Sequence, residues 1–228
     1  TIQVAKAVDG SCDSCGRCAS VCRFGAIVAI GGSVSVNPQL CKGCGRCMRA
    51  CPTGSMRERP MVIGSVETAY AGALRIVSGK LAIGDIRSPS VIEETKRAAS
   101  SGEPAYLVRD CPPGATCPTV RAVHGADLCL VVAEPTAFSL HDLRAALRFI
   151  TELGIPVGVV LNKDGTGDAD VEGLCAEFDA PLVARIPWTE ELAKAGAAGR
   201  MAPRDPSIIG ALDAIVAALP ALAGGVCA

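Results

Sequence analysis

The sequence contains few aromatic residues and no long apolar run. Aromatics make up 3% of the 228 residues, with a single Trp, so Ala, Val, Leu and Ile must build the core. No stretch approaches the roughly 18–20 consecutive apolar residues of a membrane span, and no apolar segment behind a basic start indicates a secretory signal. A membrane-spanning protein is therefore not expected, and a cytoplasmic location is favoured. Hydrophobic residues still make up 50% and charged residues 20%, as in a folded chain.

Cysteine, in contrast, is abundant and unevenly placed. Eight of the 13 cysteines fall between Cys12 and Cys51, which differs from the uniform distribution of a disulfide-rich secreted scaffold. They form two runs, Cys12–Cys22 and Cys41–Cys51, each with the C-x2-C-x2-C-x3-C spacing of bacterial two-cluster ferredoxins. The pattern predicts one iron–sulfur segment beside an otherwise ordinary fold.

The spacing also predicts which cysteines share a cluster. Three thiolates at i, i+3 and i+6 can wrap one corner of an iron–sulfur cube, and the fourth cysteine of each run crosses to the other cube. Cluster I would take Cys12, Cys15, Cys18 and Cys51, and cluster II would take Cys41, Cys44, Cys47 and Cys22. Two [4Fe–4S] clusters are preferred to structural zinc, which favours separated cysteine pairs, and to disulfides, which need an oxidising compartment.

Two further features belong to the cysteine segment. Arg23 stands where a proline usually follows the fourth cysteine, a change that bears on the local turn or on one cluster's potential rather than on ligation. Between the two runs, the sequence AIVAI-Gly31-Gly32-SVSV predicts a β-hairpin.

The net charge of −1 is unevenly distributed along the chain. Residues 1–60 hold eight Lys or Arg against three acidic residues, and residues 61–228 hold 14 against 20. Each oxidised [4Fe–4S] cube with its thiolates carries a formal charge of about −2, so two cubes offset most of the basic excess. The remaining basic residues could dock an acidic redox partner. Nucleic-acid binding is not expected, because Phe24 is the one aromatic residue in this segment.

The rest of the chain predicts an α/β fold. Residues 60–86 are β-rich, with a hairpin that turns at Ser78-Gly79. Beyond them, helices and short apolar strands alternate, which indicates a mostly parallel sheet with helices on both faces. Helices are predicted over 90–99, 118–124, 139–153 (with Ser139 as N-cap), 169–178 and 208–222, and strands over 105–108, 128–133, 157–161 and 182–186. We expect two domains, a small α+β ferredoxin-like domain at 1–59 and the α/β domain at 60–228.

Several motifs of the second part occur together in one known group of proteins. Asp110 closes a predicted strand and precedes Cys-Pro-Pro-Gly114, while Asn162 and Pro187 lie at the ends of later strands. With the cysteine segment ahead of them, they resemble the MinD/ParA/Mrp group of P-loop ATPases, more narrowly the members with an inserted two-cluster ferredoxin domain. The resemblance implies that Asp110 is the Walker B aspartate and that Gly114 belongs to the switch II loop. It also implies that Asn162 hydrogen-bonds the adenine and that the loop at Pro187 packs against the base. Taken singly, these residues are equally well read as a capping Asp, a turn Asn and a loop Pro.

The phosphate-binding loop of that group does not occur in this sequence. No G-x4-G-K-[ST] is present, and the nearest candidate, Gly72–Lys80, has the wrong spacing. Two explanations stay open, namely a sequence that starts just before the inserted ferredoxin domain of a longer protein, or a relative that has lost the loop. We favour the first, because losing a central strand would leave its neighbours with unpaired backbone groups. Binding of ATP with Mg²⁺ and its hydrolysis are expected of the complete protein and not of this chain.

The leading hypothesis is an iron–sulfur electron-transfer protein of the MinD-like superfamily, with two [4Fe–4S] clusters under nucleotide-dependent control in the complete protein. One alternative is a non-enzymatic ferredoxin-type carrier with a degenerate NTPase domain. Another is a cluster assembly or carrier factor, as the Mrp relatives suggest. The expected partner is a redox protein, and the resemblance implies a dimer with a second copy or with a related ATPase. The five other cysteines are expected to be incidental thiols.

Overall fold

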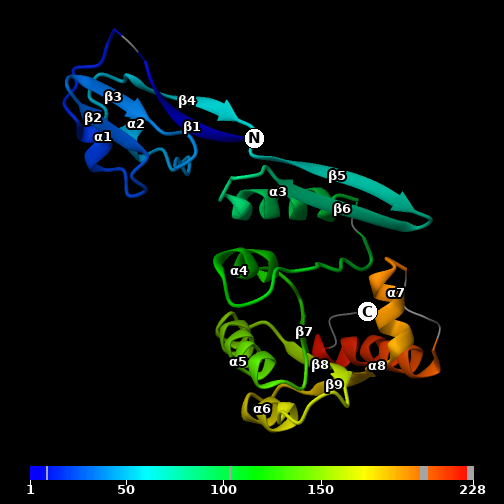
Figure 1. The fold of residues 1–228 in the computed structure, drawn as a ribbon. Coiled ribbons are helices and arrows are strands. Elements are labelled where there is room, and N and C mark those ends of the chain that lie inside the picture. The colour runs from blue at the N-terminus through cyan, green and yellow to red at the C-terminus, as the bar shows by residue number, and fades with distance from the viewer. Residues whose placement is uncertain (9, 103, 201–204, 225–228) are drawn as a thin grey trace. The chain divides into compact units, whose positions relative to one another are not determined.

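The computed structural model describes residues 1–8, 10–102, 104–200 and 205–224 (Figure 1). Cys227, one of the cysteines expected to be incidental, lies outside these ranges. The chain divides into two compact units, Thr1–Val108 and Arg109–Ala228. The boundary predicted from the sequence lies elsewhere, at the end of the cysteine segment between residues 59 and 60, and it stays a prediction.

The cysteine segment of the first unit contains two small antiparallel sheets and two short helices. Strand β1 pairs with β4 and strand β2 pairs with β3. The elements are β1 (Ile2–Ala7), α1 (Arg17–Ser20), β2 (Ile27–Ile30), β3 (Ser33–Val36), α2 (Arg46–Ala50) and β4 (Met56–Met61). The predicted β2–β3 hairpin is confirmed. Its two turn residues, Gly31 and Gly32, have φ values of 60° and 77°, as a two-residue turn matching the strand twist requires.

A longer hairpin and a helix follow in the same unit. Strands β5 (Gly64–Ala71) and β6 (Leu74–Leu81) pair in antiparallel fashion, and α3 (Ser88–Ser100) packs against them (Figure 1). The predicted turn at Ser78-Gly79 is wrong, because both residues lie within β6 and the chain reverses at Gly72 instead. A Cβ atom on Gly79 would meet the Oγ1 atom of Thr95 at 2.2 Å. This glycine therefore allows close packing of α3 and does not make a turn.

The second unit is a parallel three-stranded sheet with five helices in the described ranges. The sheet order is β7-β8-β9, and both strand pairs are parallel, as predicted. The strands are β7 (Cys129–Ala133), β8 (Val157–Asp164) and β9 (Leu182–Pro187). The helices are α4 (Cys117–Val123), α5 (Ala137–Glu152), α6 (Val171–Glu177), α7 (Glu190–Ala197) and α8 (Pro206–Leu222).

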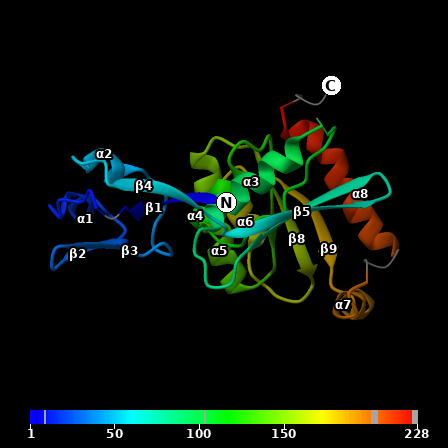
Figure 2. The same cartoon turned by 90° about the horizontal axis from the view of Figure 1, so that it is seen from above.

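Helices cover both faces of this sheet. Side chains of β8 accordingly alternate between two apolar clusters, one on each face. Val159 and Leu161 are buried in a cluster with Leu147 of α5, whereas Val160 is buried in a cluster with Ala211 of α8. Figures 1 and 2 show α8 beside β9, away from α5. The continuous apolar run of β8 is thus explained by burial on both faces.

Three details of the second part differ from the sequence prediction. The strand predicted at 105–108 is absent, and Tyr106 and Val108 are 74% and 92% exposed. An apolar run forms a strand where a neighbouring strand pairs with its backbone N–H and C=O groups. None of the described strands pairs with residues 105–108. The N-cap of α5 is Thr136 and not Ser139, because the Thr136 hydroxyl accepts the Ser139 N–H at 3.2 Å. Helix α7 was not predicted.

No helix within the described ranges combines the length and the apolar character needed to cross a bilayer.

Candidate metal centre

The two cysteine runs fold in the same way. In each run a glycine with left-handed backbone, Gly16 or Gly45, immediately precedes a short helix. The third cysteine of the run, Cys18 or Cys47, is the second residue of that helix and is buried. A residue with a Cβ atom adopts this left-handed conformation at a cost, so the glycines set the direction in which each helix leaves its cysteine loop.

The turn after the fourth cysteine is also the same in both runs. The Cys22 carbonyl accepts the Gly25 N–H at 3.3 Å, and the Cys51 carbonyl accepts the Gly54 N–H at 3.4 Å. Both glycines have positive φ, 60° and 65°. Arg23 therefore lies in a turn closed by the same hydrogen bond as the turn that contains Pro52 in the second run.

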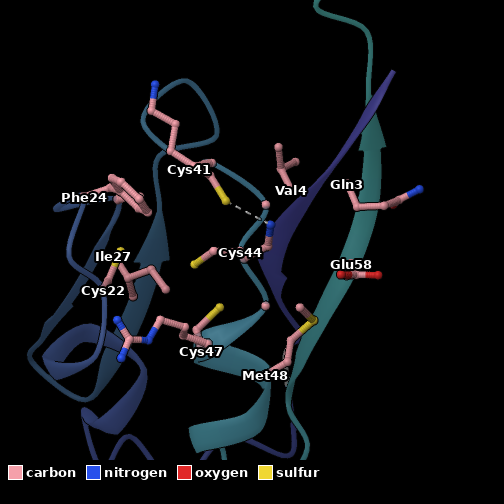
Figure 3. A pocket seen from close by; sticks show the side chains of 16 residues that line it. Gln3, Val4, Cys22, Phe24, Ile27, Cys41, Cys44, Cys47, Met48 and Glu58 are labelled. Carbon is pink, nitrogen blue, oxygen red and sulfur yellow. Dashed lines mark hydrogen bonds between the residues drawn. The ribbon is translucent and has the colours of Figure 1, made fainter. Parts of the chain in front are cut away.

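One hollow is lined by the four cysteines predicted for cluster II. Cys41, Cys44 and Cys47 come from the second run, and Cys22 crosses to them from the first (Figure 3). The Sγ atom of Cys41 accepts the backbone N–H of Ala5 in β1 at 3.4 Å. Apolar and aromatic side chains complete the wall, among them Val4, Phe24, Ile27 and Met48. The structure thus brings this predicted quartet together.

A second hollow is lined by the other predicted quartet. Cys12, Cys15 and Cys18 of the first run share it with Cys51 of the second. Val34 and Met56 contribute apolar wall, and Ser55 contributes a buried hydroxyl. The second cysteine is exposed and the third is buried in both runs, whereas the first cysteine is exposed in the first run (Cys12) and buried in the second (Cys41). The two quartets are therefore similar in exposure and differ at their first cysteine.

The charge environment differs from one thiol to the next. Burial raises the pKa of the Cys18 thiol, and the nearby Cys12 and Cys51 sulfurs raise it further. Burial likewise raises the pKa of Cys47. The Thr53 hydroxyl lies 3.6 Å from the Cys51 Sγ atom, and hydrogen bonding to this hydroxyl lowers the pKa of Cys51 to about 7. Because thiolates are the form that binds iron, the hydroxyl favours the ligand form of Cys51.

Thr53 was missed by the sequence reasoning. Its hydroxyl also lies 2.5 Å from the Ser55 hydroxyl, which in turn lies 3.0 Å from that of Ser11. The sequence signal that could have found it is its position two residues after the predicted ligand Cys51, because Ser and Thr hydroxyls commonly form hydrogen bonds to groups a few residues away.

Gly43 fixes the position of the cluster II loop against β1. A Cβ atom at this position would lie 2.4 Å from the Gln3 carbonyl oxygen, and the residue has a φ of 67°. Only glycine satisfies both constraints, so the loop between Cys41 and Cys44 can approach the strand that supplies the Ala5 N–H.

The donor chemistry of both hollows fits iron–sulfur clusters. Each has four cysteine sulfurs and a largely apolar wall, the setting in which protein-bound clusters are held. In the part of the chain that the structure describes, no three His, Cys, Asp or Glu side chains are grouped to hold a single metal ion. The assignment of each cysteine to a cluster remains a prediction, now with a geometric basis.

The residues that the resemblance assigned to nucleotide binding lie in the second unit. Asn162 in β8 is paired with Ile186 of β9, and Pro187 is the last residue of β9, so these two lie near the carboxyl ends of adjacent strands. Asp110 and Gly114 lie in the exposed loop before α4. Among the described contacts, Asp110 has no hydrogen bond or ion pair with either strand residue. These four assignments stay predictions.

The decisive comparison concerns the cysteine segment. Residues 11–55 match the family described as the 4Fe-4S dicluster domain. This segment is a 4Fe-4S dicluster domain. The iron–sulfur half of the predicted resemblance is thereby confirmed, and the chain contains a ferredoxin-type cluster-binding domain.

Longer stretches are similar to other proteins. Uncharacterized protein MJ0578 of Methanocaldococcus jannaschii is 30% identical over 179 residues, which cover 76% of this chain and 63% of the relative. Uncharacterized protein MJ0579 of the same organism is 29% identical, covering 67% of this chain and 55% of the relative. The chain thus spans less than two thirds of the length of these curated relatives.

Two solved structures are also similar to part of the chain. The MinD cell division protein of Aquifex aeolicus is 20% identical, with a TM-score of 0.46, over 58% of this chain and 59% of that one. The septum site-determining protein MinD of Pyrococcus horikoshii, complexed with Mg-ADP, is 22% identical, with a TM-score of 0.48, over 60% and 57%.

Proposed function

We propose that the protein is an electron carrier whose dicluster domain holds two [4Fe–4S] clusters, one in each cysteine-lined hollow. The observation that carries the proposal is the exchange of fourth cysteines. Cys22 lines the hollow of the second run and Cys51 lines that of the first, so each site is lined by cysteines of both runs. A bound [4Fe–4S] cluster supplies reversible one-electron transfer. Two sites built from interleaved loops suit a path for single electrons through the domain.

The chain's own residues would hold and adjust this centre. The thiolates supply the ligands, and the Ala5 N–H would stabilise negative charge on the Cys41 sulfur. Val4, Ile27 and Met48 would exclude water from the cluster II site. The first cysteine is exposed in the first quartet (Cys12) and buried in the second (Cys41), and this difference would help to give the two sites different potentials, since solvent access is one of the factors that set them.

Electron delivery tests this function. The chain would be reconstituted with iron and sulfide, reduced chemically, and mixed with an oxidised one-electron acceptor protein in a stopped-flow instrument. We expect about two electrons per chain, one for each cluster. Cys44→Ser should lower the number of electrons delivered, whereas Cys117→Ser, at an exposed thiol outside both hollows, should not. Failure to deliver electrons, or equal losses in the two variants, would contradict the proposal.

We further propose that nucleotide binding controls this transfer in the complete protein, with the dimer that the resemblance implies and the cytoplasmic location expected from the sequence. One observation supports a nucleotide site at this edge of the sheet. Asn162 and Pro187 lie at the carboxyl ends of parallel strands, where ligands of open α/β sheets bind.

The control would be tested in a protein extended to the length of the relatives. Asn162→Ala should weaken ADP binding in calorimetric titrations, and Asp110→Asn should abolish any effect of ATP with Mg²⁺ on the rate of electron delivery. The control would be contradicted if Asn162→Ala left the ADP affinity unchanged and nucleotide had no effect on the rate of electron delivery by the unaltered protein. Both results together would favour an electron carrier without nucleotide control.

A further inference from the structure

Arg87, at 3% exposure, is the most deeply buried charged residue in the described part of the chain. It is the N-cap residue of α3, and its side chain is 2% exposed. The neighbouring Asp85 side chain is 6% exposed. The Arg87 Nε atom donates to the Asp85 carboxylate at 2.7 Å, and the Nη2 atom donates to the second carboxylate oxygen. The pair is therefore a two-pronged, buried ion pair.

The other edge of the guanidinium faces the cysteine loop. Its Nη1 atom donates to the Pro38 carbonyl at 2.9 Å and to the Cys41 carbonyl at 3.2 Å. Cys41 is the first cysteine of the cluster II quartet and lines its hollow. The cation therefore lies against this loop, with the carboxylate bound on its opposite edge.

The first run has no matching arrangement among the described contacts. Cys12 holds the position equivalent to Cys41, and it is exposed. In the hydrogen bonds described for the cysteine loop of the first run, the Cys15 N–H donates to Asp13 within the loop at 3.2 Å and the Ser14 hydroxyl donates to the Gly32 carbonyl, and neither brings a buried cation to it. The buried ion pair thus distinguishes two cysteine runs that otherwise fold alike.

We propose that Arg87 and Asp85 form a buried dipole beside the Cys41 loop that sets the potential of cluster II apart from that of cluster I. This inference rests on the proposed assignment of Cys41 to cluster II. Reduction adds one negative charge to a cluster. The positive end of the pair lies toward the loop, so it favours the reduced form and raises the potential.

The two partners then have opposite effects. Arg87→Gln removes the cation and leaves only the carboxylate, so the potential of cluster II should fall. Asp85→Asn keeps the shape of the side chain but removes its negative charge, so the Arg87 cation is uncompensated and the potential of cluster II should rise. A role in loop packing alone would move the potential in the same direction in both variants, because each breaks the same pair.

The test is a redox titration followed by electron paramagnetic resonance, with iron content measured on the same samples. The reconstituted chain should show two reduction steps. Cys44→Ser and Cys15→Ser, one ligand in each quartet, assign the steps to cluster II and cluster I. The cluster II step should move down in Arg87→Gln, up in Asp85→Asn, and stay close to its original value in Arg87→Lys, which keeps the charge. Arg75→Gln is the matched control, since Arg75 bonds the carbonyls of Ala98 and Ser101 at the far end of α3.

Each outcome of the titration either supports or overturns the proposed role of Arg87 and Asp85. Opposite shifts confined to the cluster II step support the proposal. Shifts of the same sign, no shift, or loss of one cluster from both Arg87→Gln and Asp85→Asn overturn it in favour of packing alone. If the unaltered chain holds no [4Fe–4S] clusters, the proposed function itself has failed, and the iron content shows this separately from any effect of Arg87.

Discussion

At the scale of single residues, Gly43 gives the sharpest prediction. Gly43→Ala would place a Cβ atom 2.4 Å from the Gln3 carbonyl oxygen, in a backbone conformation that already disfavours a side chain. The loop must then move away from β1, and we expect loss of the Ala5 contact to Cys41 together with one cluster. The iron content after reconstitution should fall by about half, since each cube holds four irons.

Gly25→Ala is the matched control for Gly43. Gly25 also has a positive φ, 60°, but nothing lies within 4 Å of the position its Cβ atom would take. Its cost is therefore the backbone strain alone, about 1–2 kcal/mol of unfolding free energy. Equal iron loss in both variants would show that conformation, and not the approach to Gln3, controls the loop.

Thr53 gives a prediction about pH. Its hydroxyl stabilises the Cys51 thiolate and holds the pKa of Cys51 at about 7. In the cluster-free protein, alkylation of Cys51 should therefore rise through about pH 7, and Thr53→Val should move the midpoint to higher pH because the charged form loses its hydrogen bond. Peptide mapping after iodoacetamide treatment across pH 6–9 measures this. A midpoint that does not move in Thr53→Val would contradict the assignment of the cause.

The cysteine spacing predicted the cluster ligands, but it could not predict which residues surround them. The two quartets follow from the i, i+3, i+6 pattern and a crossing fourth cysteine, and the hollows contain these sets. Arg87 could not be found in this way, because it meets the Cys41 loop 46 residues away in sequence. No local pattern marks a long-range contact of that kind.

At the scale of elements, the packing of α3 on its hairpin depends on Gly79. Gly79→Ala would place a methyl group 2.2 Å from Thr95 Oγ1 and 2.9 Å from Val91 Cγ1. We expect a loss of about 1–3 kcal/mol of unfolding free energy, the usual cost of overpacking. Chemical denaturation measures it. Ser78→Ala, at the preceding residue of the same strand, should cost little, and Thr95→Ala should recover part of the loss in the Gly79 variant.

The same glycine explains where sequence reasoning about elements failed. A Ser-Gly pair between apolar residues is typical of a turn, but here the missing side chain accommodates a helix that lies further along the chain. The strands of the parallel sheet were easier to predict, because β7, β8 and β9 are largely apolar runs separated by helices. The run at 105–108 has the same composition without a pairing partner among the described strands, and composition alone does not reveal this.

At the scale of the whole chain, the described residues that line the two cysteine hollows all belong to the first unit, and the α/β fold belongs to the second. The second unit should therefore be dispensable for cluster binding. Placing Asn162→Ala in the reconstituted chain should leave the iron content and both reduction potentials unchanged. A lowered iron content in this variant would show that the second unit takes part in holding the clusters.

The central claim is that this chain holds two [4Fe–4S] clusters in interleaved cysteine quartets. The most direct measurement is the iron and sulfide content of the reconstituted chain, combined with electron paramagnetic resonance of the reduced sample. The account predicts about eight irons and eight sulfides per chain, with a spectrum from two interacting reduced cubes. A stable complex with zinc and without iron, or a single isolated cluster in the unaltered chain, would contradict it.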